Sequence, residues 1–117
     1  MAHPALRLDN AVHQRTRLGI LTILAGADRA DFSFLRDTLD LTDGNLSRNL
    51  TVLENAGFVA IDKTFEGRRS RTWISVTPAG QKALNQEIQA LREIVQVVDS
   101  QPAAGARSRP RPGPAIP

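Results

Sequence analysis

The residues best suited to chemistry in this 117-residue sequence lie on one short segment, residues 43–56. A helix there would turn an arginine, two asparagines and two hydroxyls outward. Glu54 is the one acid within residues 45–56. Arginine can pair with guanine, asparagine with adenine, and a hydroxyl with a phosphate or a base. These outward side chains are Asn45, Ser47, Arg48, Asn49 and Thr51. They favour recognition of a nucleic-acid groove over the alternative of an ordinary solvated helix face.

The start of the same helix offers a second kind of contact. Thr42 is a suitable N-cap, and the backbone N–H groups near Gly44 can approach a phosphate. Asp43 opposes such an approach, so we expect its carboxylate to cap the helix or face away.

Directly after this helix the apolar period changes to two, over residues 59–62 and again over residues 72–76. Residues 65–70 between these runs are polar apart from Phe65 and include Gly67. The pattern predicts a β-hairpin with a charged tip. We expect Trp73, in the returning strand, to pack across the hairpin.

Four cations gather near the predicted tip, with Glu66 as the one acid among them. They are Lys63, Arg68, Arg69 and Arg71. Such a cluster can follow a DNA backbone or enter a narrow minor groove. Protection of an edge strand by charge is the alternative, but it requires fewer cations. We therefore predict a second nucleic-acid contact here.

Three helices are predicted before the hairpin, each with its own N-cap. Asp9 would cap a first helix that ends near Ala25, Asp31 a second and Thr42 a third. Gly57 lies where a left-handed residue closes the third helix. The apolar positions expected to face a core are Val12, Leu18, Ile20, Leu21, Leu24, Phe32, Leu35, Leu39, Leu46, Leu50, Leu53 and Ala56.

Thr77 and Pro78 then predict the start of a last helix over residues 78–98. Its apolar positions are spaced four, three, four and three, which is typical of a helix-pairing seam. They are Leu84, Ile88, Leu91, Val95 and Val98. We expect this helix to form a homodimer interface; the alternative is that it packs on the first helix of its own chain.

The length fits one domain over residues 9–98, including the dimerisation helix. Residues 1–8 are expected to be a flexible N-terminus. Residues 99–117 are expected to be a disordered tail rich in proline and arginine. The tail carries the whole net charge of +3, since residues 1–100 are neutral and the hairpin is their one basic island.

Several classes of function are disfavoured by composition. The sequence has no cysteine and two histidines, and the conceivable pair of Asp9 and His13 is too small to close a metal site. We therefore expect no enzyme, no catalytic residue, no metal and no cofactor. No membrane span or signal peptide is visible, so a cytoplasmic protein is expected.

Six stretches of this sequence resemble the MarR- and ArsR-type winged-helix regulators. Residues 46–50 and 53–59 are similar to the recognition helix and exit strand of that superfamily. Residues 68–73 and 77–80 are similar to its wing and to the start of the following helix. Together with residues 31–35 and 41–45, they match a compact MarR-like subgroup with a single domain. Asn49 departs from the histidine found in many relatives, so no base preference follows at that position.

The predicted fold class is mainly α with a small β-hairpin, a winged helix-turn-helix with a C-terminal dimerisation helix. The resemblance implies a transcription factor, often a repressor, that acts as a homodimer on a pseudo-palindromic operator in double-stranded DNA. The alternatives are a winged-helix protein–protein adapter and a non-specific architectural DNA-binding protein. A small-molecule effector stays open, because no cluster of polar residues marks its pocket.

Overall fold

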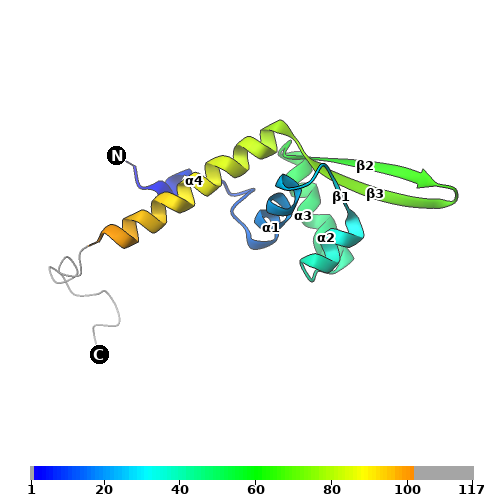
Figure 1. The fold of residues 1–117 in the computed structure, drawn as a ribbon, viewed down its shortest axis with the longest axis horizontal. Coiled ribbons are helices and arrows are strands. Elements are labelled where there is room, and N and C mark those ends of the chain that lie inside the picture. The colour runs from blue at the N-terminus through cyan, green and yellow to red at the C-terminus, as the bar shows by residue number, and fades with distance from the viewer. Residues whose placement is uncertain (1, 102–117) are drawn as a thin grey trace, which may run out of the picture.

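The structure, a computed structural model, describes residues 2–101 as four α-helices and a three-stranded sheet (Figure 1). The elements in chain order are the 3-10 helix η1 (Pro4–Arg7), α1 (Arg15–Ala25), β1 (Ala30–Asp31), α2 (Phe32–Thr38), α3 (Asp43–Asn55), β2 (Val59–Glu66), β3 (Arg69–Val76) and α4 (Pro78–Ser100). The hairpin β2–β3 extends from one side of the helical body, and α4 extends from the other. The predicted mainly-α fold class with a β-hairpin is confirmed.

Most predicted helix boundaries are confirmed by their caps. The side chains of Asp31, Thr42 and Thr77 each accept a hydrogen bond from the backbone N–H three residues later. Gly57 follows α3 with φ of 80°, a conformation that glycine adopts at little cost. These caps fix where α2, α3 and α4 begin.

The predicted start of the first helix at Asp9 is wrong. The helix α1 begins at Arg15, and Gln14 is its N-cap, accepting from the N–H of Arg17. Asp9 instead accepts a hydrogen bond from the N–H of Ala11 at 2.7 Å, which closes a separate turn. A local hydrogen bond between a side chain and the backbone competes with helix formation, and here the chain forms the turn instead of a helix.

The sheet has the antiparallel order β1-β3-β2. The hairpin is longer than predicted, because both strands run up to a two-residue turn at Gly67 and Arg68. Gly67 has φ of 66°, as a type II′ turn requires at its first central position. The two-residue strand β1 was not predicted, since so short a segment carries no alternating pattern.

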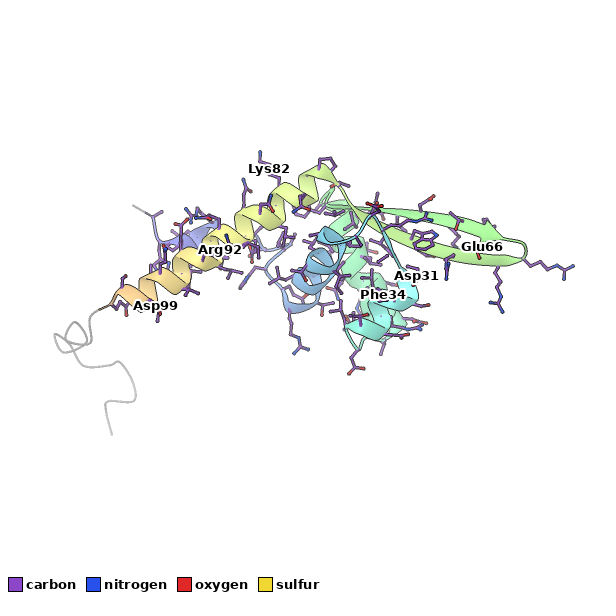
Figure 2. All side chains as sticks on the ribbon, viewed as in Figure 1. Asp31, Phe34, Glu66, Lys82, Arg92 and Asp99 are labelled. Carbon is purple, nitrogen blue, oxygen red and sulfur yellow. The ribbon has the colours of Figure 1, made fainter. Side chains whose placement is uncertain are left out.

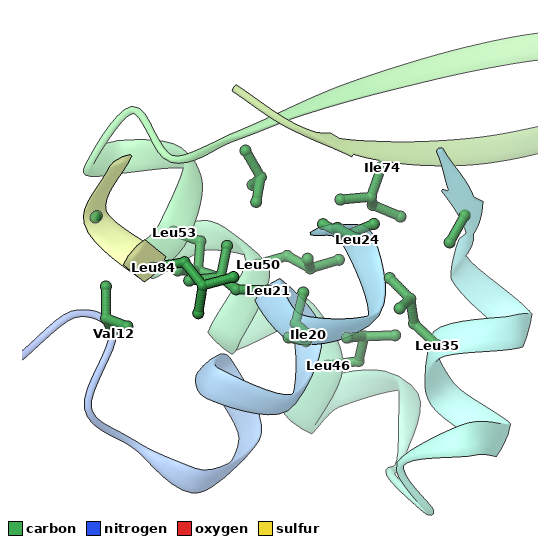
Figure 3. Packing of buried hydrophobic residues seen from close by; sticks show 13 residues of the cluster. Val12, Ile20, Leu21, Leu24, Leu35, Leu46, Leu50, Leu53, Ile74 and Leu84 are labelled. Carbon is green, nitrogen blue, oxygen red and sulfur yellow. The ribbon is translucent and has the colours of Figure 1, made fainter. Parts of the chain in front are cut away.

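The core lies between the helices and the base of the hairpin (Figure 3). Side chains of α1 meet those of α3, while Ile74 of β3 and Leu35 of α2 complete the cluster. The fully buried large apolar residues are Val12, Ile20, Leu21, Leu24, Leu35, Leu46, Leu53 and Ile74. Most expected core positions are confirmed, whereas Ala56 is exposed because it lies at the end of α3.

The role predicted for Leu84 is wrong. This residue is buried in the core of its own chain, and Ile88 packs partly against the same core. Only the later part of the predicted seam is free, since Val95 and Val98 are exposed and Leu91 is half-buried. The alternative that α4 packs on its own chain therefore holds for its first half.

The N-terminal segment differs from the flexible stretch that was expected. It forms η1, which lies beside the C-terminal half of α4 (Figure 1). Arg7 pairs with Glu93 of α4 at 2.7 Å. The predicted tail falls mostly outside the described residues, and residues 99 and 100 belong to α4.

We expect acid to detach η1 from α4. The hydrogen bond from Arg7, with a further one from Gln89, lowers the pKa of Glu93 below its usual 4.5. A lowered pKa stabilises the folded contact above the usual value, and this contribution is lost as the pH falls. The ¹⁵N relaxation of the Leu6 amide should report increasing motion as the pH falls below 4.5. In Glu93→Gln the same motion should be present at neutral pH; a rigid η1 in that variant would contradict the account.

Candidate nucleic-acid interface

The outer face of α3 presents several of the DNA-contact residues predicted from sequence. Gly44, Ser47, Arg48 and Thr51 are exposed on it, and Thr42 caps its start. The hydroxyl of Thr51 donates back to the Ser47 carbonyl at 3.0 Å, so its acceptor lone pairs stay available. Within the described residues, Arg48 forms no ion pair. This face can therefore offer a cation and hydroxyls to a groove.

Asn49 has a different position from the one expected of a base-reading residue. It is half-buried, and its amide nitrogen donates to the carbonyl and side-chain oxygens of Asn45, at 2.9 and 2.8 Å. Its amide oxygen accepts from Arg17 at 2.9 Å. Both ends of the amide are thus hydrogen-bonded within the chain, and these bonds connect α3 to α1.

Arg17 was not singled out in the sequence, although it connects three segments. Besides Asn49, its guanidinium donates to the backbone carbonyls of Ala11 and Asn10, at 2.6 and 3.2 Å. This arginine therefore ties α1 and the preceding turn to α3. Its position before the apolar run of α1 gave no signal of that role.

The carboxylate of Asp43 pairs with α2 and does not cap α3, whose N-cap is Thr42. It accepts a hydrogen bond from Arg36 of α2 at 2.9 Å. Hydrogen bonds to Asp37 and Asp43 raise the pKa of Arg36 further above its usual value. The cation of Arg36 offsets the acid beside the first turn of α3, which leaves that turn less repulsive to a phosphate.

Ion pairs divide the cations of the hairpin into two groups. Arg71 pairs with Asp31 and Glu66, at 3.3 and 3.6 Å, so its charge is partly offset within the chain. Within residues 2–101, no ion pair involves the other three predicted cations. These are Lys63, Arg68 and Arg69, all exposed.

Trp73 packs across the hairpin, as predicted. Its indole N–H donates to the hydroxyl of Thr64 on β2 at 3.1 Å. The guanidinium of Arg29 lies 3.8 Å from its ring centroid, and that of Arg71 lies 5.0 Å away. The cation–π contact with Arg29 holds the hairpin to the loop before β1, whereas the contact with Arg71 lies within β3.

The buried acid of the structure was also missed from sequence. The carboxylate of Glu87 on α4 is fully buried, where it contacts Nδ1 of His13 at 2.7 Å and accepts from the N–H of Asp9 at 3.2 Å. His13 therefore faces Glu87 rather than Asp9. One feature of the sequence indicated this burial: Glu87 lies three residues after Leu84, on the same face of the predicted helix.

Other kinds of site find little support in the described part of the chain. No group of three or more His, Cys, Asp or Glu side chains there could hold a metal ion. Between residues 2 and 101, no helix combines the length and apolar character needed to cross a membrane. A shallow groove of about 720 Å³ lies between the start of η1 and the end of α4, with Pro4 and Val97 among its lining residues.

The sequence profile described as winged helix DNA-binding domain matches residues 16–95. An uncharacterized protein of Methanocaldococcus jannaschii is 34% identical over 94 residues, covering 80% of this chain and 99% of that protein. A transcriptional regulator homologue from Pyrococcus horikoshii has a solved structure with a TM-score of 0.78 and 28% identity. That match covers 84% of this chain and 99% of the other.

The fold also occurs in a Mycobacterium tuberculosis transcriptional regulator solved in complex with DNA. The TM-score is 0.63 at 20% identity, and the match covers 86% of this chain and 71% of that one. Regulators of the MarR family have the same fold. The resemblance inferred from the sequence is confirmed by these matches.

Proposed function

This chain belongs to the winged helix DNA-binding domain family, and we propose that it is a DNA-binding regulator that acts as a homodimer on a pseudo-palindromic operator. The observation that carries the proposal is the pairing of two surfaces that expose cations free of ion pairs within residues 2–101. Arg48 is exposed on α3, while Lys63, Arg68 and Arg69 are exposed on the hairpin. The helix would enter the major groove, and the hairpin would contact the flanking backbone or minor groove.

Dimerisation is supported by the apolar surface left on α4 and η1. Val95 and Val98 are 56% and 64% exposed, and Leu6 of η1 is 77% exposed. Ile94 and Val97, half-buried in one chain, widen the same surface. A two-fold dimer would place two α3 helices about 34 Å apart, on successive turns of the duplex. It would also double the phosphate contacts of a body that is neutral over residues 1–100.

A charge placed on this surface is expected to separate the dimer. Val95→Glu should give a monomer at micromolar concentration, because the dimer would have to bury an unpaired carboxylate. Gln96→Glu adds the same charge at the neighbouring exposed position and should leave a dimer. Size-exclusion chromatography with light scattering distinguishes the two. A wild-type monomer at that concentration would contradict the role proposed for α4.

The sequence specificity is tested by selecting genomic fragments with the purified protein. The proposal expects one recurring motif with approximate two-fold symmetry. Fragments without a shared motif would instead favour the non-specific architectural alternative. Failure to retain duplex DNA at all would favour the protein–protein adapter.

We also propose that the protein is a repressor and that it acts in the cytoplasm. Both proposals rest on analogy with other winged-helix regulators. A regulator of this kind blocks transcription when its operator overlaps a promoter. If an effector exists, the groove between η1 and α4 is the candidate place. Because that groove borders the proposed dimer surface, a ligand there would act by changing dimer geometry.

A further inference from the structure

The register of the hairpin gives its two faces different chemistry. Paired residues of antiparallel strands point to the same face, and successive residues alternate. One face therefore carries Asp62 and Glu66 opposite Trp73 and Arg69. The other face carries Lys63 opposite Thr72 and Phe65 opposite Ser70. None of these four residues is an acid. An anion is accepted more readily by this acid-free face.

Phe65 is the aromatic residue of the acid-free face. It pairs with the small residue Ser70, one position before the end of β2, and it is 70% exposed. Lys63 lies two residues away on the same face, and Arg68 lies in the turn beyond. A large apolar ring at the end of an extended arm thus stands between cations, with no partner in the described chain.

Side-chain contacts along one face stabilise the position of the hairpin. The contacts of Trp73 with Thr64 and Arg29 hold one face. On the same face, the ion pair of Arg71 with Asp31 connects the hairpin to β1, and that with Glu66 connects β3 to β2. All of these contacts lie on the face opposite Phe65. The ring of Phe65 therefore lies on a stabilised β-hairpin and not on an irregular loop.

We propose that Phe65 inserts between two base pairs in the minor groove and bends the DNA when the wing is seated. Apolar wedges that enter a base step unstack it and open the minor groove, while neighbouring cations hold the phosphates on either side. The order of cation, aromatic ring and cation along the wing fits that arrangement. The inference rests on the proposed DNA-binding function and adds a deformation of the duplex to it.

The test compares Phe65→Ala with Phe34→Ala on a duplex recovered by selection from a random-sequence pool. Phe34 is 55% exposed on α2, away from the hairpin tip (Figure 2), so its removal deletes an exposed ring without touching the wing. Energy transfer between dyes at the duplex ends reports bending, and 2-aminopurine placed at each candidate step reports unstacking. Anisotropy gives the affinity of each variant in the same buffer.

Wild type and Phe34→Ala should bend the duplex by at least about 20° and brighten 2-aminopurine at one step in each half-site. Phe65→Ala should still bind, with about tenfold lower affinity, and lose both signals. Wild-type binding to a straight duplex, or equal bending by Phe65→Ala, would overturn the inference and leave the DNA-binding function intact. Dissociation of the dimer by Phe65→Ala would also overturn it, by placing the ring at a subunit contact. Absence of any wild-type binding would overturn the function itself.

Discussion

Gly80→Ala is expected to lower the free energy of unfolding by about 3 kcal/mol, at the upper end of what overpacking usually costs. Gly80 is buried in the first turn of α4, directly against the chain that leaves α3. A Cβ there would overlap the carbonyl oxygen of Phe58 and lie 2.8 Å from its carbonyl carbon. Both atoms belong to the backbone, so no side-chain rotation relieves the clash.

The clash would also disturb the hydrogen bonds between the start of β2 and the start of α4. The Phe58 carbonyl accepts a hydrogen bond from the N–H of Thr77 at 3.0 Å, and the Thr77 hydroxyl donates to the Gly57 carbonyl. Urea denaturation followed by circular dichroism measures the loss. Gly44→Ala is the matched control, because its nearest new contact would be the flexible end of Arg48 at 3.7 Å. The control should be unchanged or slightly more stable. Equal stability of the two variants would contradict this packing.

Arg48→Ala and Arg69→Ala are expected to weaken DNA binding in different ways. Arg48 lies on the proposed recognition helix, so its loss should cost about 1–3 kcal/mol per half-site on the selected duplex and relax specificity. Arg69 lies in the wing, where a phosphate contact carries no sequence information. Its loss should weaken selected and random duplexes alike and reduce the salt slope by about one for each half-site.

Lys82→Ala is the control for the loss of one positive charge. Lys82 is exposed on the first half of α4, on the side away from α2 and α3 (Figure 2). Competition binding with selected and shuffled duplexes gives the specificity ratio of each variant. If Arg48→Ala and Lys82→Ala behave alike, α3 is not the reading element.

Local signals were enough to predict much of the fold. Asp31, Thr42 and Thr77 cap helices because each hydroxyl or carboxylate precedes an apolar run with helical spacing. Gly57 closes α3 because its position requires a positive φ. The hairpin was visible as a change of apolar period, and its basic tip as a local excess of charge.

The remaining features depend on contacts between distant segments. Arg17 and Asn49 are 32 residues apart in the chain, so nothing local predicts the hydrogen bond between their side chains. Arg71 belonged to the basic cluster by sequence, yet the two-residue strand β1 brings Asp31 to it. Leu84 fitted the helical seam, but the side chains of its own chain cover it first. Spacing predicts which face is apolar and leaves open what covers that face.

The central claim is that the exposed face of α3 and the cations of the wing bind a specific duplex together. Fluorescence anisotropy of wild-type protein with the selected duplex and its shuffled counterpart, over a salt series, tests it most directly. We expect affinity for both to fall linearly with the logarithm of salt concentration, with the selected duplex bound at least about a thousandfold more tightly at physiological salt. Equal affinity for the two duplexes, or binding that does not change with salt, would contradict the account.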